Sequence, residues 1–283
     1  MKIRVFWENY RLFMKTPIVL AHGMLGLAQA FIQGLKLADY FKGIPEWMRE
    51  NGCEVITPQV EGIGANETRA ENLKNQINEA TNGPVHIIAH SQGGLDSRHM
   101  ITHLGMAEKV RTLTTIATPH RGSPIADWAI SKTQQVGVFK ILEWSTMDTQ
   151  AFKDLRTSEC AEFNRKTPDV DSVKYFSVVG EPKREEMLTP LRTFHDIVLE
   201  HEGPNDGLVS SQSASWGEDI TTWQADHAQQ IGWFNEPSFD WRDGWGKILN
   251  QLKEIYSFWN KQINVISRKD MDSFYERHVL HSK

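Results

Sequence analysis

One stretch of ten residues, 85–94, constrains the fold of this chain more than any other. Its first half, Val85–Ala89, is an apolar run rich in β-branched residues, which predicts a buried strand. Residues 95–104 can continue as a helix before a glycine stops it. Between them, residues 89–93 read Ala-His-Ser-Gln-Gly, which is the G-x-S-x-G spacing of a strand–turn–helix with alanine in the first glycine position. This spacing predicts that Ser91 lies on a tight, strained turn, with its hydroxyl exposed at the carboxyl end of a sheet.

The rest of the chain alternates strand and helix patterns around this turn. Helical spacing predicts helices over 40–50 and 68–80. Further short apolar runs predict strands over 17–21, 54–58, 113–117 and 173–180. Strands that alternate with helices at this spacing favour a parallel, doubly wound sheet. With 283 residues and 40% hydrophobic content, we expect one α/β domain over residues 1–283.

Residues 124–168 interrupt this rhythm, because they contain no strand pattern. Two interpretations stay open: a helical cap or lid over a substrate, and helices that pack on the sheet. Farther along, apolar residues from Trp245 to Trp259 repeat at i, i+3, i+4 and i+7, which predicts an amphipathic helix. We expect it to close one face of the sheet, with a lipid-surface role as the alternative. Residues 268–283 are typical of a polar C-terminal tail.

Charge and cysteine usage exclude several classes of function. The net charge is −5 and there is no long basic run, so nucleic-acid binding is not expected. No apolar run has the length of a membrane span, and the N-terminus lacks the apolar centre of a signal peptide, which favours a cytoplasmic protein. Cys53 and Cys160 could pair, but two buried free thiols fit better.

Two late residues are candidates for an acid and a base that would serve Ser91. Asp206 lies in an Asn-Asp-Gly turn, where we expect it to follow a late strand, and His227 lies in a loop after the strand-like residues 221–223. The order serine, aspartate, histidine is the one in which a nucleophile elbow is joined by its triad partners. Asn-Asp-Gly is also a common turn, and a lone histidine is more often structural. Of the eleven histidines, His22 and His90 lie within the motifs next to the serine, and His120 is expected to hold its loop. His195 and His201 would reverse the order, and those at the C-terminus belong to the polar tail.

With these residues in hand, the chain resembles the bacterial true lipases and the related fungal triacylglycerol lipases of the α/β-hydrolase fold. The resemblance runs from about Pro17 to about Trp233. It depends on several motifs in the same order: His22-Gly23-Met24-Leu25-Gly26, the elbow 89–94, Thr118-Pro119-His120-Arg121-Gly122-Ser123, Phe163-Asn164 and Asn205-Asp206-Gly207-Leu208-Val209.

The resemblance implies a role for each of five residues. Ser91 would be the nucleophile, His227 the general base and acid, and Asp206 the residue that orients the histidine. The backbone N–H groups of Met24 and Gln92 would form the oxyanion hole. It also implies a mostly parallel central sheet flanked by helices, with a lid-like cap within 124–168.

One position departs from the calcium-dependent bacterial lipases. In those proteins an aspartate two residues after the catalytic histidine helps to bind a structural Ca²⁺, whereas here the residue is Gln229. An amide oxygen can ligate calcium but brings no charge, so we predict no metal and no other cofactor.

The expected function is a serine ester hydrolase that cleaves acylglycerols or similar lipid carboxylic esters, with a lipid–water interface as one place of action. A short-chain carboxylesterase or polyester hydrolase with the same triad is the nearest alternative. A hydrolase fold that binds without turnover is a further one. The acyl chain, the alcohol and the oligomeric state are not determined by these patterns.

Overall fold

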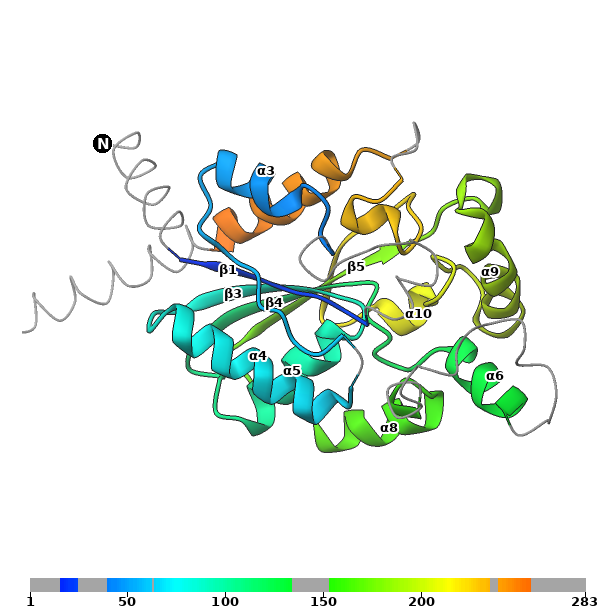
Figure 1. The fold of residues 1–283 in the computed structure, drawn as a ribbon, viewed down its shortest axis with the longest axis horizontal. Helices are drawn as coiled ribbons and strands as arrows, with labels where there is room; N and C mark the ends of the chain where they lie inside the picture. Colours follow the sequence, from blue (N-terminus) through cyan, green and yellow to red (C-terminus); the bar gives the residue numbers. More distant parts are fainter. Residues whose placement is uncertain (1–15, 25–39, 63, 134–152, 235–238, 256–283) are drawn as a thin grey trace, which may run out of the picture.

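The structure, a computed structural model, describes residues 16–24, 40–62, 64–133, 153–234 and 239–255. Its centre is a six-stranded sheet of order β2-β1-β3-β4-β5-β6, in which every neighbouring pair is parallel (Figure 1). The strands are β1 (Ile18–Ala21), β2 (Val55–Ile56), β3 (Val85–His90), β4 (Val110–Ile116), β5 (Lys174–Gly180) and β6 (Glu218–Trp223). The predicted α/β class with a parallel sheet is therefore confirmed.

Helices cover both faces of this sheet (Figure 1). On one face lie α3 (Ile44–Glu50) and the helical residues 241–255, and on the other lie α4 (Asn66–Ala80) and α5 (Gly93–His103). Strand β1 shows why, because Ile18 and Leu20 join one apolar core while Val19 and Ala21 join the other. A strand that is apolar on both faces is stable only between two layers of helices.

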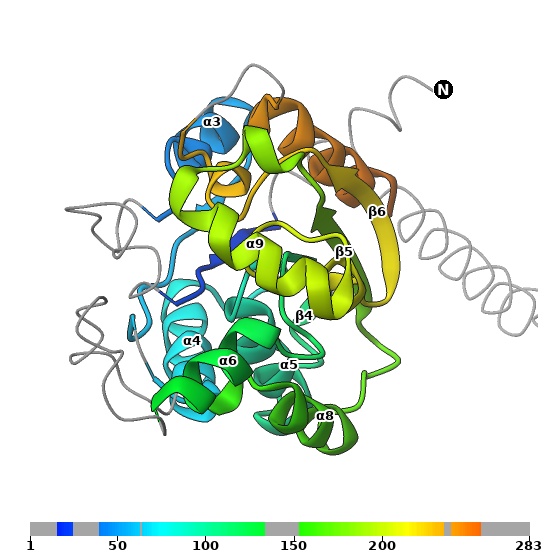
Figure 2. The same cartoon turned by 90° about the vertical axis from the view of Figure 1, so that its right-hand side faces the viewer.

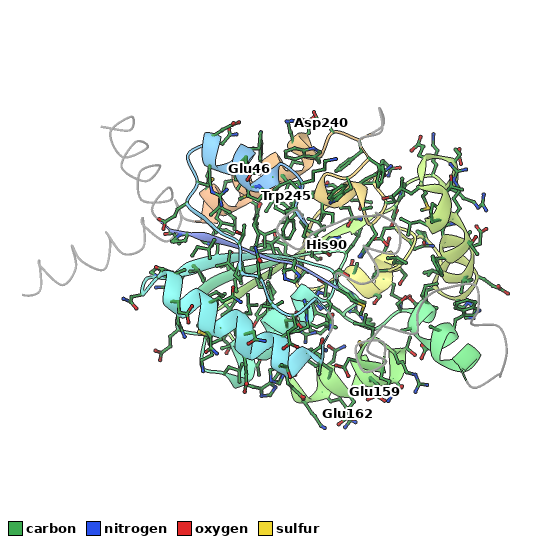
Figure 3. The ribbon with its side chains drawn as sticks, in the orientation of Figure 1. Glu46, His90, Glu159, Glu162, Asp240 and Trp245 are labelled. Atoms are coloured by element: carbon green, nitrogen blue, oxygen red, sulfur yellow. The ribbon has the colours of Figure 1, made fainter. Side chains whose placement is uncertain are left out.

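The C-terminal helix packs against the first of these cores, as predicted. Trp245 is fully buried there, and its ring meets Phe41 edge-on at 5.8 Å between centroids (Figure 3). Its indole N–H donates to the backbone carbonyl of Gln230 at 2.9 Å. The predicted end of this helix, 256–259, lies outside the described residues.

Several predicted boundaries differ from the structure; the strand expected over 113–117, for example, is β4 at Val110–Ile116. The first helix begins at Ile44 and not at residue 40, because Gly43 before it has a left-handed backbone with φ of 71°. The strand expected over 54–58 pairs only at Val55 and Ile56, since it is the short edge strand β2.

The insertion 124–168 is described in part. It begins with α6 (Pro124–Thr133) and ends with α8 (Thr157–Lys166), while residues 134–152 lie outside the described part of the chain. Helix α6 lies beside α9 (Thr189–Glu202), where Trp128 and Phe194 meet edge-on at 6.4 Å (Figure 2). A lid in this region stays a prediction, as does the tail 268–283, which is also outside the described residues.

Short elements complete the fold near the sheet's carboxyl edge: η4 (Arg184–Glu186), α10 (Ser211–Ala214) and η5 (Gln229–Ile231). Both cysteines are buried and unpaired, as expected. None of the helices in the described ranges is long and apolar enough to cross a bilayer.

Candidate active site

Ser91 lies on the sharp turn between β3 and α5. Its φ is 54°, in the left-handed region that non-glycine residues rarely adopt. The turn is held from both sides, because the Ser91 N–H donates to the carbonyl of Ile116 at 2.9 Å and its carbonyl accepts from the Thr118 hydroxyl at 2.8 Å. These bonds to β4 and to the loop after it keep the serine backbone in its strained conformation.

The small residues around Ser91 are required by close backbone approach. A Cβ added at Gly93 would lie 2.5 Å from the carbonyl oxygen of Ala21 at the end of β1. At Gly94 it would collide with the Thr118 side chain. Ala89 is fully buried in the sheet, where its single methyl fits.

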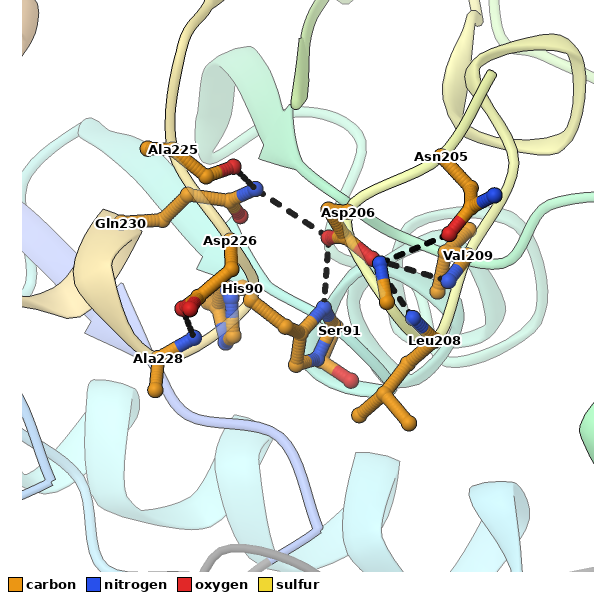
Figure 4. A network of polar contacts seen from close by, with 12 residues as sticks. His90, Ser91, Asn205, Asp206, Leu208, Val209, Ala225, Asp226, Ala228 and Gln230 are labelled. Carbon is orange, nitrogen blue, oxygen red and sulfur yellow. Dashed lines mark hydrogen bonds and ion pairs between the residues drawn. The ribbon is translucent and has the colours of Figure 1, made fainter. Parts of the chain in front are cut away.

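Asp206 and His227 are in direct contact. The Nδ1 atom of His227 lies 2.7 Å from Oδ2 of Asp206, and the backbone N–H of His227 donates to the Asp206 carbonyl at 3.0 Å. The other carboxylate oxygen accepts from the N–H groups of Leu208 and Val209 at 3.0 and 2.9 Å (Figure 4). Because Asp206 is 1% exposed, these bonds supply the polar partners that water cannot.

The predicted position of Asp206 in the fold was wrong in one respect. It follows helix α9, not a strand, and lies in the loop between α9 and α10. It still reaches the end of β5, since a Cβ built on Gly180, the last residue of that strand, would lie 2.9 Å from the Asp206 Cβ. His227 follows β6, as expected.

His227 lies beside His90, the residue that precedes Ser91 in the chain. The rings of His90 and His227 are tilted against each other with centroids 4.4 Å apart. Among the described residues, the Ser91 hydroxyl makes no hydrogen bond to the His227 ring. Hydrogen bonds to a serine nucleophile are often absent without substrate, so this geometry is compatible with a serine and its base.

Met24 and Gln92 lie on the two loops beside Ser91. The loop after β1 packs closely against the serine, because a Cβ added at Gly23 would lie 2.6 Å from the Ser91 Cβ. Gln92 is fully buried, and its side chain donates to the Gly64 carbonyl and the Asn66 side chain at 3.1 and 2.9 Å. Within the described part of the chain, the backbone N–H groups of Met24 and Gln92 have no hydrogen-bond partner. Both groups lie next to Ser91, where the sequence predicts donors.

Comparisons with known proteins show the family of this chain. The chain matches the family model of a PGAP1-like alpha/beta domain over residues 69–181. It is 32% identical over 247 residues to triacylglycerol lipase 2 of Saccharomyces cerevisiae, which covers 82% of this chain and 74% of the relative. This chain belongs to the triacylglycerol lipase family of α/β-hydrolases. A triacylglycerol lipase of Vibrio cholerae is 28% identical, over 77% of this chain and 80% of its own.

Solved structures agree on the fold. A metagenomic carboxyl esterase superposes with a TM-score of 0.68 at 19% identity, over 84% of this chain and 76% of that chain. Over a 36-residue stretch, 13% of this chain, the chain is also 58% identical to a ribosomal RNA small subunit methyltransferase G of Cytophaga hutchinsonii, and the match covers 17% of that protein. The predicted family is therefore confirmed. The predicted class of enzyme, a lipase or carboxylic ester hydrolase, is confirmed as well.

A buried arginine supports the Met24 loop of this lipase, and sequence analysis did not find it. Arg69 on α4 is fully buried and donates through Nη2 to the carbonyls of His22 and Gly23 at 2.8 and 3.4 Å. Its Nε lies 2.8 Å from the carboxylate of Asp96 on α5, and Nη1 donates to the carbonyl of Glu61. The guanidinium thus joins the loop after β1 to the helix that begins at the serine turn.

His22 fixes the same peptide unit. Its Nε2 accepts from the Val60 N–H at 3.1 Å, so the proton must be on Nδ1, which donates to the Gly23 carbonyl at 2.8 Å. Burial, and then the charge of Arg69, lower the pKa of His22 to about 4, which keeps the ring neutral. Since the C=O of Gly23 and the N–H of Met24 belong to one planar trans peptide, fixing the carbonyl aims the N–H the opposite way.

Two further residues hold the histidines of this lipase. The Nε2 amide of Gln230 donates to Oδ2 of Asp206 at 3.1 Å, beside His227, and to the Ala225 carbonyl at 3.2 Å. The hydroxyl of Tyr40 lies 2.8 Å from Nδ1 of His90. Burial, and then the charge of His227, keep the pKa of His90 well below its usual range. Neither residue belongs to a recognisable motif, since each acts only through contacts that the fold creates.

The residues at the position of the calcium aspartate do not fit a metal. The Gln229 side-chain oxygen accepts from the Asp226 N–H at 2.8 Å, and its nitrogen donates to the Glu186 carbonyl at 3.0 Å. Both ends of the amide are therefore engaged within the protein. Across the described ranges, no cluster of three or more His, Cys, Asp or Glu side chains could hold a metal ion.

Proposed function

We propose that this enzyme hydrolyses acylglycerols or similar lipid esters through a Ser91–His227–Asp206 triad and an acyl-enzyme. The observation that carries the proposal is the 2.7 Å contact between His227 Nδ1 and the buried Asp206 carboxylate, in a loop beside the strained Ser91. Because Nδ1 is held by Asp206, Nε2 of His227 is the nitrogen that can exchange a proton with the serine.

The reaction then has two halves. Ser91 Oγ attacks the ester carbonyl while His227 takes its proton, and the tetrahedral oxyanion accepts hydrogen bonds from the N–H groups of Met24 and Gln92. His227 returns the proton to the departing alcohol, which leaves an acyl group on Ser91. Water, deprotonated by His227, attacks this ester and releases the fatty acid and free serine.

A lipid substrate is supported by the relatives and by the apolar side chains near Ser91. The relatives named above are triacylglycerol lipases. The Met24 side chain packs in an apolar cluster with residues of α5, α6, the segment before α8 and α8 itself: Leu95, Ala126, Ala129, Leu155 and Cys160. Apolar residues of the insertion therefore lie next to the proposed oxyanion hole, where an acyl chain would begin.

Hydrolysis of p-nitrophenyl esters from acetate to palmitate tests the proposal, with Ser91→Ala and Asp206→Asn assayed alongside. We expect cleavage of long-chain esters, no turnover by Ser91→Ala and a large loss in Asp206→Asn. A fluorophosphonate probe should label the wild type and leave Ser91→Ala unlabelled. Cleavage of acetate and butyrate alone would instead favour a short-chain esterase, and an active Ser91→Ala would refute the triad.

A further inference from the structure

The loop that carries His227 is joined by hydrogen bonds to a second segment, residues 186–188, which lies just before α9. Asp226 is fully buried, and its Oδ2 accepts from the N–H of Leu188 at 2.8 Å. Gln229, 2% exposed, donates through its side-chain nitrogen to the carbonyl of Glu186 at 3.0 Å. The residue before His227 and the residue two after it thus both reach the same short segment.

These two side chains also hold each other. Oδ1 of Asp226 accepts from the N–H groups of Ala228 and Gln229 at 3.0 and 2.9 Å, and the Gln229 side-chain oxygen accepts from the Asp226 N–H at 2.8 Å. This reciprocal pattern has the bonding of a capping box, placed in the turn just before η5, whose own N-cap residue is Ala228. An ordinary capping box would use only these inner bonds. Here the second oxygen of Asp226 and the amide nitrogen of Gln229 are directed outward to residues 186–188.

The segment that they reach also bears on Asp206. Leu188 is the residue that precedes α9, and Asp206 follows the end of that helix. At that end, the side chain of Asn205 donates to the carbonyls of His195 and Gly203 at 3.2 and 3.0 Å. The His227 loop is therefore fastened to the start of α9, and the Asp206 loop to its last turns, so one helix sets the positions of both residues.

We infer that Asp226 and Gln229 are positioning residues, whose direct hydrogen bonds to residues 186–188 hold His227 in place without a divalent cation. The inference rests on the proposed role of His227 as the base. In the calcium-dependent lipases that the chain resembles, a bound metal lies at this position; here, hydrogen bonds within the chain take its place. The Gln229 oxygen already accepts from the Asp226 N–H, it brings no charge, and the described residues hold no group of three or more His, Cys, Asp or Glu side chains that could bind a metal ion.

We call the hydrogen bonds from Asp226 and Gln229 to residues 186–188 the clamp. Three variants test its parts separately. Gln229→Ala removes the inner and the outer bond of the glutamine, whereas Gln229→Glu keeps an oxygen for the Asp226 N–H and loses the donor to Glu186. Asp226→Asn leaves only one acceptor oxygen for three N–H groups. Gln76→Ala is the matched control. The side-chain amide of Gln76, on α4, also accepts from a backbone N–H and donates to a backbone carbonyl, both of Gln59, at 2.8 and 2.9 Å.

Hydrogen–deuterium exchange and steady-state kinetics should be measured for each protein, in excess EDTA and in added CaCl2. For the wild type, we expect the same kcat and the same exchange in both buffers. Gln229→Ala, Gln229→Glu and Asp226→Asn should exchange faster at residues 186–188 and 226–230, and lose about tenfold or more in kcat with little change in KM. Gln76→Ala should behave as the wild type in both respects.

Two results would overturn the inference. One is a wild-type loop whose exchange slows, or whose kcat rises, when calcium replaces EDTA. The other is unchanged exchange and kcat in all three clamp variants. The exchange measurement does not depend on the triad, so it still decides whether the clamp exists if Ser91→Ala or His227→Ala remains active and the proposed function fails.

Discussion

The guanidinium of Arg69 and the carboxylate of Asp96 form a fully buried ion pair, 2.8 Å from Nε to Oδ2, that links α4 to α5. The pair affects the stability of the fold and also the position of the loop after β1, because the same guanidinium donates to the carbonyls of His22 and Gly23. Burial raises the pKa of Asp96 to about 7, against the opposing charge of Arg69, so this carboxylate depends on its partner to remain ionised.

Replacing Arg69 should therefore reduce stability and catalysis separately. Arg69→Met leaves Asp96 buried and unpaired, which costs about 3–5 kcal/mol in the free energy of unfolding. The double variant Arg69→Met/Asp96→Leu removes both charges and should recover most of that loss in urea unfolding. Its kcat should remain low, because the loop before Met24 is still unsupported. Recovery of kcat together with stability would show that Arg69 acts on folding alone.

Two replacements of Ser91 should separate catalysis from backbone strain. Ser91→Ala keeps a side chain at φ of 54°, whereas Ser91→Gly can adopt this φ freely. Both variants should be inactive, and Ser91→Gly should be the more stable by about 1 kcal/mol in urea unfolding. Equal stability of the two would mean that the turn stores no strain at this residue.

Gly180, at the end of β5, should not tolerate a side chain. A Cβ there would collide with the Gln230 amide and lie 2.6 Å from the Ala225 carbonyl. Gly180→Ala should displace the Gln230 contact with Asp206, lowering both kcat and the unfolding temperature. Gly246→Ala, in the C-terminal helix, is the control, since an added Cβ meets nothing within 4 Å and should stabilise the helix by up to about 1 kcal/mol. An active, stable Gly180→Ala would refute this close packing.

Acid should destabilise the fold, because four buried histidines are neutral in it. Burial first, with the neighbouring charges of Arg69 and Arg111, lowers the pKa of His22 and His86 to about 4, and burial holds the pKa of His90 and His120 well below 6.5. Unfolded histidines take up protons near pH 6.5. The stability that these groups contribute is thus fully present above pH 6.5 and is lost as the pH falls toward 4, by about 1.4 kcal/mol per pH unit for each histidine.

Urea unfolding over this pH range measures the slope. His86→Gln should make it shallower than in the wild type, by the share of one histidine. A slope that is the same in His86→Gln as in the wild type would contradict the prediction for His86.

Sequence patterns predicted the sheet and the contacting residues because both depend on short local signals. Apolar runs located the strands, and the order of three motifs brought Asp206 to His227. The supporting residues arise from contacts between distant segments, such as Arg69 with His22. One signal was present: Arg69 precedes Leu73 and Ile77 at four-residue intervals, on the buried face of α4. A charged residue in an apolar stripe predicts a buried partner, but not which one.

The bond from the Trp245 indole to the Gln230 carbonyl has a consequence for the protein during its synthesis. The serine turn leaves the ribosome long before His227, and the loop that carries this histidine is completed only when the C-terminal helix docks on the sheet. A nascent chain that already has its nucleophile is thus expected to be inert toward esters. Activity would begin only once the helix over 241–255 has been synthesised and has docked, so the nucleophile would not act on esters before that point.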